Sequence, residues 1–141
     1  MTCHNLCLIG FGNVGQALVR LLQVRQDDLR ARYGIEWRVT GLMTRRLGFH
    51  ADPSGFDPFA LLAGQVAPTS LPAGTTLPQW LHAARAGVLF DTSALNAQTG
   101  EPATSYLRAT LAAGVHAITA NKGPIVHAYG ELCALAVAHG K

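Results

Sequence analysis

The chain has 141 residues, of which 49% are hydrophobic and 13% are charged, and its formal net charge is +3. This length and composition predict a globular chain with one ordinary core, most simply a single domain. The basic residues are scattered, and only Arg45 and Arg46 are adjacent, which argues against a nucleic-acid partner. No apolar run is long enough to cross a bilayer or to act as a secretory leader, so we expect a cytoplasmic protein without a membrane partner.

The three cysteines, Cys3, Cys7 and Cys133, include no C-x-x-C pair, which favours neither a disulfide framework nor a zinc site. Cys7 and Cys133 both fall on apolar faces, so we expect them to be small buried hydrophobes in a reducing compartment. The six histidines are dispersed, and no two stand at helical i, i+4 spacing beside a carboxylate. The sequence therefore predicts no bound metal.

An apolar run, Leu6 to Ile9, breaks into three glycines, Gly10, Gly12 and Gly15, with the spacing G-x-G-x-x-G. The first glycine of this spacing allows a tight turn, the second lets a pyrophosphate approach the backbone, and the third lets a helix pack on the strand. The N–H groups and positive dipole end at the helix N-terminus then favour an anion. By itself the spacing is a weak indication, and its value depends on the elements around it.

The elements after the turn supply that context. Apolar residues recur at three- and four-residue steps from Val14 to Tyr33, and Gly34 follows, which predicts one long amphipathic helix. Residues 36–43 then read as a second strand. Together with the first strand they predict a right-handed βαβ unit.

The end of the second strand bears on the choice of cofactor. In a βαβ unit of this kind, an acidic residue there favours NAD, and an arginine can pair with the 2′-phosphate of NADP. Glu36 stands at the wrong end of the strand, whereas Arg45 and Arg46 follow its exit. We therefore expect Arg45, together with Arg46, to face the adenosine end and to give preference for NADP or at least tolerance of it. A solvated basic turn is the alternative.

The remaining chain alternates between helices and strands. Residues 47–78 are irregular, with one short helix expected at 57–63, capped by Asp57 with Pro58 in its first position, and with room for a further element. Beyond them we expect a helix at 78–86, a strand at 87–90, a helix opened by Pro102 and stopped by Gly114, a strand at 115–119 and a last helix with its stripe from Tyr129 to Val137. This order predicts an α/β fold, doubly wound, with a mainly parallel sheet covered on both faces.

Ligands of such sheets bind outside the carboxyl ends of the strands. Ser93 follows one strand and could bond a cofactor's ribose or carboxamide, although a local Ser turn is the simpler interpretation. Lys122 follows another strand and is one of only two lysines in the chain. Its ammonium could anchor a substrate carboxylate or take part in proton transfer, and a surface turn before Gly123-Pro124 is the alternative. Asp91 could orient the turn after its strand, and we do not assign it as a catalytic acid.

Three segments resemble one family. They are Ile9-Gly-Phe-Gly-Asn-Val-Gly15, Phe90-Asp-Thr-Ser93 and Thr119-Ala-Asn-Lys-Gly-Pro124, and the last is the most specific. With them the chain resembles the N-terminal, Rossmann-type NAD(P)-binding domain of homoserine dehydrogenase. The resemblance implies NAD(P)-dependent interconversion of L-homoserine and L-aspartate 4-semialdehyde, a step towards threonine and methionine.

The resemblance also implies roles for individual residues. Lys122 would stand between cofactor and substrate as the catalytic residue of this chain, and Ser93 would lie by the nicotinamide ribose. Together with Arg45 and Arg46, placed at the adenosine end by their position after the second strand, the cofactor-binding set would comprise Gly10, Phe11, Gly12, Asn13, Val14 and Gly15 at the pyrophosphate and ribose, and Ser93, Ala120, Asn121 and Lys122 at the reacting end.

One departure from the family pattern limits the expected activity. Family members continue into a substrate-binding and dimerisation domain that supplies an acidic residue and a lysine for proton transfer, and nothing in residues 1–141 matches it. We therefore expect one dinucleotide-binding domain that turns over homoserine negligibly by itself, while the full-length enzyme would be a homo-oligomer. A stand-alone regulatory nucleotide-binding module is the alternative. An aspartate dehydrogenase or a semialdehyde dehydrogenase is a third possibility, but neither Cys7 nor Cys133 is placed to be the nucleophile that a semialdehyde dehydrogenase needs.

Overall fold

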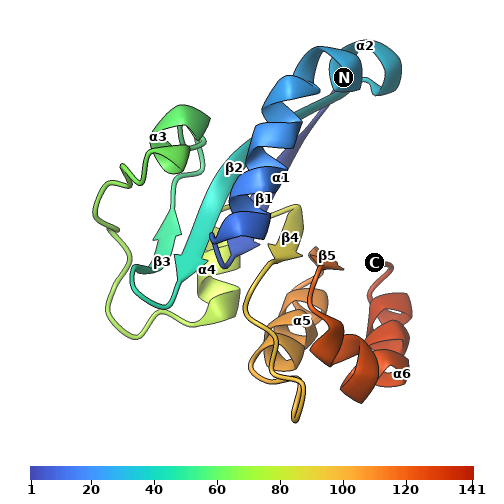
Figure 1. Ribbon diagram of the computed structural model, residues 1–141. Coiled ribbons are helices and arrows are strands. Elements are labelled where there is room, and N and C mark those ends of the chain that lie inside the picture. The colour runs from blue at the N-terminus through green and yellow to red at the C-terminus, as the bar shows by residue number, and fades with distance from the viewer.

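A five-stranded sheet with the strand order β3-β2-β1-β4-β5 forms the centre of the molecule in the computed structural model, which describes residues 1–141 (Figure 1). The strands β1, β2, β4 and β5 are parallel, and β3 pairs antiparallel with β2. The strands are β1 (Thr2–Ile9), β2 (Ile35–Thr44), β3 (Gly48–Ala51), β4 (Val88–Asp91) and β5 (His116–Thr119). The predicted α/β fold with a mainly parallel sheet is confirmed.

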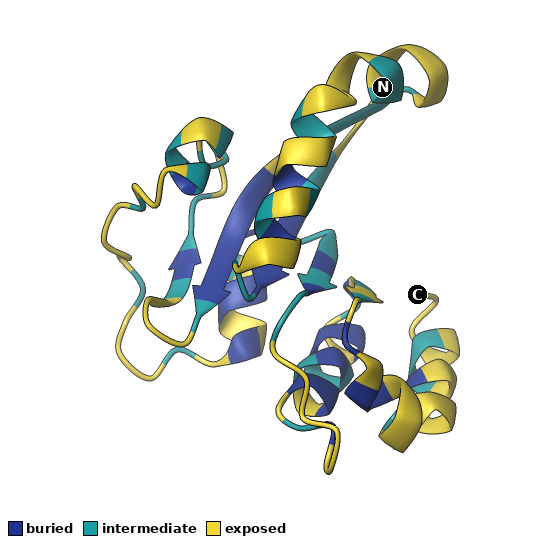
Figure 2. Cartoon of the chain, viewed as in Figure 1, coloured by how far each residue is buried: buried dark blue, intermediate teal, exposed yellow.

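Consecutive residues of β1 face opposite sides of the sheet, and this alternation builds two cores. Leu8 packs with Val19 and Val39 on the side of α1 (Asn13–Val24) and α3 (Pro58–Leu62). Cys7 and Ile9 pack on the other side, which α4 (Leu77–Ala83) covers and where α5 (Ala103–Ala112) packs on β4 and β5. In Figure 2 the dark blue of buried residues runs along the central strands and continues into α4 and α5.

The last helix, α6 (Lys122–Ala138), lies against α5 rather than on the sheet, with Leu132 packed between Leu107 and Leu111 (Figure 1). The expectation of a sheet covered on both faces is therefore wrong at β5, where the Ile118 side chain is 51% exposed. No helix of the structure has the length and apolar character needed to cross a membrane.

The predicted single helix after the glycine turn is wrong, because the structure has two helices, α1 and α2 (Gln26–Tyr33), joined at Arg25. The predicted apolar stripe is also rotated: Val14 and Tyr33 are exposed, and the buried residues of α1 are Gly15 and Val19. The physical reason is the close contact of Gly15 with the end of β1, which fixes the inward face of the helix and places Val19, one turn later, in the core.

Residues 47–78 contain the further secondary-structure element that the sequence pattern left undefined. This element is β3, which forms a hairpin with β2, and His50 at its centre is buried with its ring nitrogens at hydrogen-bond distance from two backbone carbonyls. The predicted helix caps are confirmed: the Asp57 carboxylate accepts hydrogen bonds from two N–H groups of α3, which has Pro58 at its start.

Two element boundaries and one burial prediction also differ. β1 begins at Thr2, before the apolar run from Leu6, and α6 begins at Lys122, seven residues before the predicted stripe from Tyr129, with a kink at Ala128. Cys133 is exposed, because the inward face of α6 is set by Leu132 against α5, whereas Cys7 is fully buried as expected.

Candidate functional site

The glycine turn between β1 and α1 excludes side chains at two of its three glycines. Gly10 has a φ of +81°, and a Cβ atom there would lie 2.6 Å from the carbonyl oxygen of Thr92. A Cβ atom on Gly15 would lie 2.9 Å from the carbonyl oxygen of Gly10. The first glycine thus provides the tight turn and the third provides the close contact between helix and strand, as the spacing predicts.

Gly12 has the opposite surroundings, since no atom lies within 4 Å of the position that its Cβ would take. Gly12 is also the N-cap of α1, and no side chain caps that helix. The first N–H groups of α1 therefore face open space with the positive end of the helix dipole behind them. These features fit the pyrophosphate of a dinucleotide.

Thr92 joins the glycine turn to the end of β4. Its hydroxyl donates a hydrogen bond of 2.8 Å to the carbonyl oxygen of Gly10, and its backbone N–H donates to Ile9. Sequence reasoning singled out the segment Asp91-Thr92-Ser93 but assigned no role to Thr92. The available signal was its place directly after a buried strand beside the turn.

Ser93 and Asn121 lie together at the ends of β4 and β5. The Ser93 hydroxyl donates to the carboxylate of Asp91 over 2.6 Å. The Asn121 side chain caps α6 by accepting from the Gly123 N–H, and its amide donates to the carbonyl oxygen of Ala94 over 3.2 Å. The loop after β4 and the start of α6 are thus tied to each other.

Lys122 is the first residue of α6, and its exposed ammonium has no ion pair or hydrogen-bond partner within the described residues 1–141. Ala120 and Asn121 directly precede it at the end of β5, and the Ala120 N–H donates to the carbonyl oxygen of Asp91. The residues predicted for the reacting end therefore do come together at the carboxyl edge of the sheet, namely Ser93, Ala120, Asn121 and Lys122. Their contacts with a cofactor stay a prediction.

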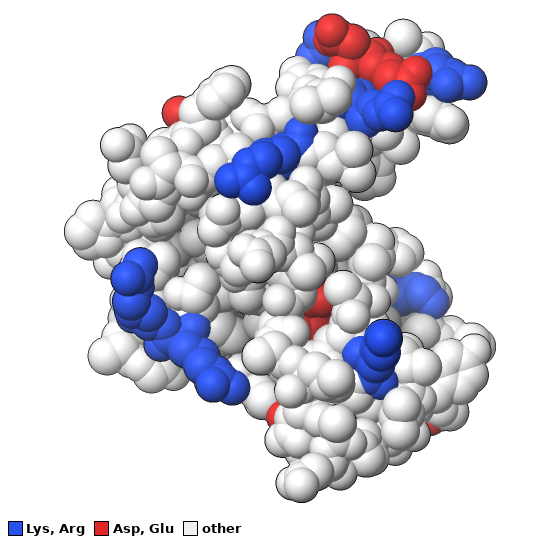
Figure 3. Space-filling view, in the orientation of Figure 1, with Lys and Arg blue, Asp and Glu red and all other residues white.

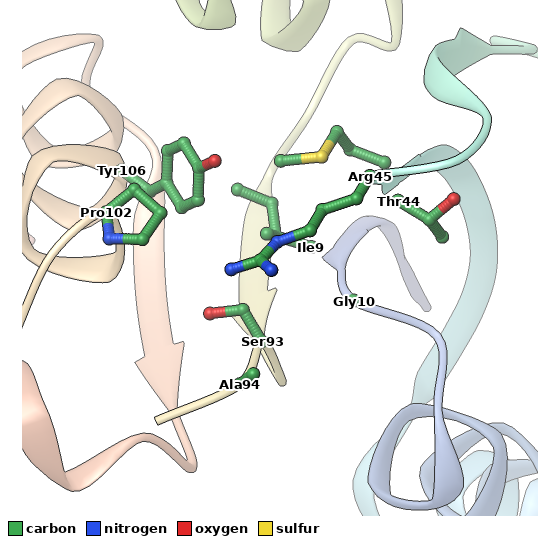
Figure 4. A pocket seen from close by; sticks show the side chains of 9 residues that line it. Ile9, Gly10, Thr44, Arg45, Ser93, Ala94, Pro102 and Tyr106 are labelled. Atoms are coloured by element: carbon green, nitrogen blue, oxygen red, sulfur yellow. The ribbon is translucent and has the colours of Figure 1, made fainter. Parts of the chain in front are cut away.

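Arg45 and Arg46 lie on different sides of the glycine turn. Arg45 lines a cavity of about 180 Å³ together with Gly10, Ser93 and Tyr106. In Figure 4 the Arg45 side chain runs from the end of β2 across this cavity, and its guanidinium lies between Ser93 and Tyr106. Arg46 lines a separate pocket of about 530 Å³ between the start of α1 and α3.

The charge distribution agrees with an anion site at this edge. Basic side chains form a band over the turn between β2 and β3, and a further basic side chain stands across a hollow from them (Figure 3). Glu36 lies at the opposite end of β2 and forms an ion pair of 2.9 Å with Arg30. Glu36 therefore stands where β2 begins, as the sequence predicts, and not at the exit of that strand.

A parallel sheet whose first strand leads through a glycine-lined turn into an uncapped helix defines the class of dinucleotide-binding domains. The chain belongs to the family of homoserine dehydrogenase NAD-binding domains, since the family model "Homoserine dehydrogenase, NAD binding domain" matches residues 10–141.

Relatives of known name agree with this assignment. The chain is 34% identical to an NAD(+)-dependent homoserine dehydrogenase from Pseudomonas canavaninivorans and 30% identical to a homoserine dehydrogenase from Sulfurisphaera tokodaii. Each match covers 96% of the chain but only 40% and 39% of the relatives. The chain thus spans about two fifths of the length of these curated relatives.

Solved structures show the same fold. A hyperthermophilic archaeal homoserine dehydrogenase in complex with NADPH superposes with a TM-score of 0.77 at 22% identity, over 99% of this chain and 42% of that one. A putative homoserine dehydrogenase from Archaeoglobus fulgidus gives a TM-score of 0.74 at 22% identity, over 97% of this chain and 40% of that one.

Proposed function

We propose that residues 1–141 are the cofactor-binding domain of an enzyme that interconverts L-homoserine and L-aspartate 4-semialdehyde. The observation that carries the proposal is the turn from Gly10 to Gly15, where two glycines exclude side chains and Gly12 leaves the start of α1 open to a pyrophosphate. Membership of the homoserine dehydrogenase family supplies the substrate pair. The bound nicotinamide supplies the chemistry, which is hydride transfer.

The residues of this chain would bind and orient. The N–H groups of α1 would hold the pyrophosphate, with Phe11, Asn13 and Val14 beside it, and Ser93 would lie by the nicotinamide ribose. The Lys122 ammonium, free of partners at the start of α6, would stand between cofactor and substrate and engage a substrate oxygen or carboxylate. The acid and base that move the substrate proton would belong to residues outside this chain, so we expect negligible turnover by residues 1–141 alone.

We further propose that Arg45 gives NADP preference or at least tolerance. The support is its position directly after β2; its guanidinium reaches the cavity of Gly10 and Ser93 in this structure and would turn towards the adenosine end to meet a 2′-phosphate. Arg46, in the neighbouring pocket with Gly12, would assist. We also propose that the full-length enzyme works in the cytoplasm as a homo-oligomer, in keeping with a role in amino-acid biosynthesis.

Calorimetric titration of the 141-residue chain with NADPH and NADH tests both proposals. We expect both to bind and NADPH to bind more tightly, and Arg45→Ala should remove most of that difference, since a phosphate contact of an arginine is charge-assisted. Clearly tighter binding of NADH would contradict the role of Arg45. Absence of binding by either dinucleotide would contradict the proposed function, and robust homoserine-dependent NADPH formation by this chain would contradict its expected inactivity.

A further inference from the structure

We propose that Asp91 is a positioning residue that fixes the Ser93 hydroxyl as a hydrogen-bond acceptor for a donor group of the bound dinucleotide. The proposal rests on the proposed function and goes beyond it, because it assigns the direction of one hydrogen bond and the residue that sets it. The ligand must accordingly present a hydrogen-bond donor to Ser93.

Asp91 is the last residue of β4, and its side chain is fully buried. One carboxylate oxygen, Oδ1, accepts from the Ser93 hydroxyl over 2.6 Å and from the Ser93 N–H over 3.1 Å. The other, Oδ2, accepts from the Thr119 hydroxyl over 2.8 Å. No cation pairs with Asp91, so these three donors replace the water that burial has removed.

A count of protons fixes the direction of these bonds. A carboxylate can only accept, so the single proton of the Ser93 hydroxyl points at Asp91. The Ser93 oxygen accepts one long hydrogen bond of 3.4 Å from Nδ2 of Asn121, which also donates to the carbonyl oxygen of Ala94 over 3.2 Å. Ser93 therefore presents its remaining lone pair, and not a proton, to whatever lies in the cavity that it lines.

A dinucleotide offers two donors that fit such an acceptor at its reacting end. One is a hydroxyl of the nicotinamide ribose, and the other is the N–H of the nicotinamide carboxamide. Both groups would donate a hydrogen bond to Ser93, and analogues that lack one or the other group distinguish them.

The same carboxylate also fixes the spacing between the two strand ends. Thr119, which donates to Asp91, accepts the backbone N–H of Asn121 over 2.9 Å, and the Asp91 carbonyl oxygen accepts from Ala120 over 3.0 Å. Through these bonds one buried side chain orders the loop that carries Ser93 and the residues that lead into Lys122. Loss of the carboxylate should therefore disturb the orientation of Ser93 more than it disturbs the glycine turn.

The test compares dissociation constants for three ligands: NADP⁺, its acetylpyridine analogue, which lacks the carboxamide N–H, and an analogue without the nicotinamide-ribose hydroxyls. For the native chain we expect one analogue to bind about tenfold more weakly than NADP⁺, which is the upper range for one hydrogen bond. In Asp91→Ala, which removes the acceptor of the Ser93 proton, and in Ser93→Ala that ratio should fall to nearly one. A purely structural loss would weaken all three ligands equally and leave the ratio unchanged.

The chain offers a matched control at an exposed turn. Asp52 accepts from the N–H and the hydroxyl of Ser54 in the same Asp-x-Ser arrangement, away from the cavity. Asp52→Ala should leave the dissociation constants and their ratio unchanged. If Asp91→Ala does not fold, Thr119→Val releases Oδ2 without changing the charge, and the ratio should then fall by about threefold.

The outcomes separate this proposal from the proposed function. A native chain that binds no dinucleotide contradicts both. A native chain that binds NADP⁺ but does not discriminate against either analogue overturns the role of Ser93 alone. Discrimination that persists in Asp91→Ala, or in Thr119→Val where that variant is used instead, overturns the role of Asp91 and leaves the proposed function standing.

Discussion

At the scale of single residues, the glycines of the turn differ in what they tolerate. Gly10 and Gly15 face backbone atoms at less than 3 Å, while Gly12 faces open space and has a φ of −85°. An alanine therefore fits at position 12 without strain but places a methyl group where the pyrophosphate would approach. Glycine is therefore needed for folding at positions 10 and 15 and for access of the ligand at position 12.

We predict that Gly12→Ala leaves the free energy of unfolding within about 0.5 kcal/mol of the native value and weakens dinucleotide binding at least about tenfold. Urea unfolding and calorimetric titration measure the two quantities. Gly130→Ala is the matched control, since Gly130 also faces open space but lies in α6, where alanine should stabilise the helix by about 0.5–1 kcal/mol without changing binding. Unchanged binding in Gly12→Ala would show that the turn does not hold the pyrophosphate.

Cys7 provides a pH-dependent prediction at the same scale. Burial raises the pKa of its thiol to about 12, because the thiolate would lose its hydration in the core. The protonated thiol is favoured by the fold, so its contribution to stability is complete below the unfolded thiol pKa of about 8.5 and is lost as the pH rises towards 12.

We therefore expect a thiol reagent at pH about 8.5 to modify the exposed Cys3 and Cys133 in the native protein and to reach Cys7 only on unfolding. Cys7→Ala should show a shallower loss of stability above that pH than the native chain. Modification of Cys7 at the rate of Cys3 would contradict its burial.

At the scale of elements, Trp80 links α4 to the hairpin of β2 and β3. Its side chain is fully buried and stacks on Phe49 with ring centroids 5.0 Å apart, and its Nε1 donates to the carbonyl oxygen of His50 over 2.7 Å. It also occupies the space beside Gly41, where a Cβ atom would lie 2.9 Å from the indole ring. This side chain thus packs α4 against β3, a strand of only four residues that pairs with β2.

We predict that Trp80→Phe lowers the free energy of unfolding by about 2–4 kcal/mol, because it leaves a buried carbonyl without its donor and opens a cavity. Trp37→Phe is the matched control. The Trp37 Nε1 is buried without a partner, so its removal sacrifices no hydrogen bond and should cost clearly less. Urea unfolding followed by circular dichroism measures both variants, and equal losses would contradict the importance of the hydrogen bond to His50.

At the scale of the whole molecule, the features that could be predicted from the sequence are those that depend on residues close to one another in the chain. The parallel strands, the glycine turn, the cap of α3 and the convergence of Ser93 and Lys122 follow from local patterns and from the geometry of parallel sheets. The sequence pattern did not define β3, because this strand of four residues pairs only with β2 and packs against Trp80, which is thirty residues away from His50 in sequence. The face of α1 was misjudged because Gly15, which has no apolar side chain, sets it through backbone contact.

The candidate site also contains residues that the sequence predicts and residues whose role depends on how the strands pair. The residues that would touch the ligand stand directly after strands and could be named from the sequence, whereas Thr92 and Asp91 act through hydrogen bonds to residues on other strands. Such bonds need the register of β1, β4 and β5, which pairs Ile9 with Asp91 and Asp91 with Thr119. That register is a property of the folded sheet rather than of any segment.

The cofactor edge joins β1, β2 and β4, so ligand binding should stabilise the molecule as a whole. A ligand that binds only the folded chain raises the free energy of unfolding by about 2.7 kcal/mol at a concentration one hundred times its Kd. We predict that NADPH at this concentration raises the Tm by about 8 °C, at about 3 °C per kcal/mol for a domain of this size. Gly12→Ala at the same NADPH concentration should show a much smaller shift, because its weaker binding lowers the ratio of ligand to Kd. An unchanged Tm of the native chain at saturating NADPH would contradict binding to the folded state.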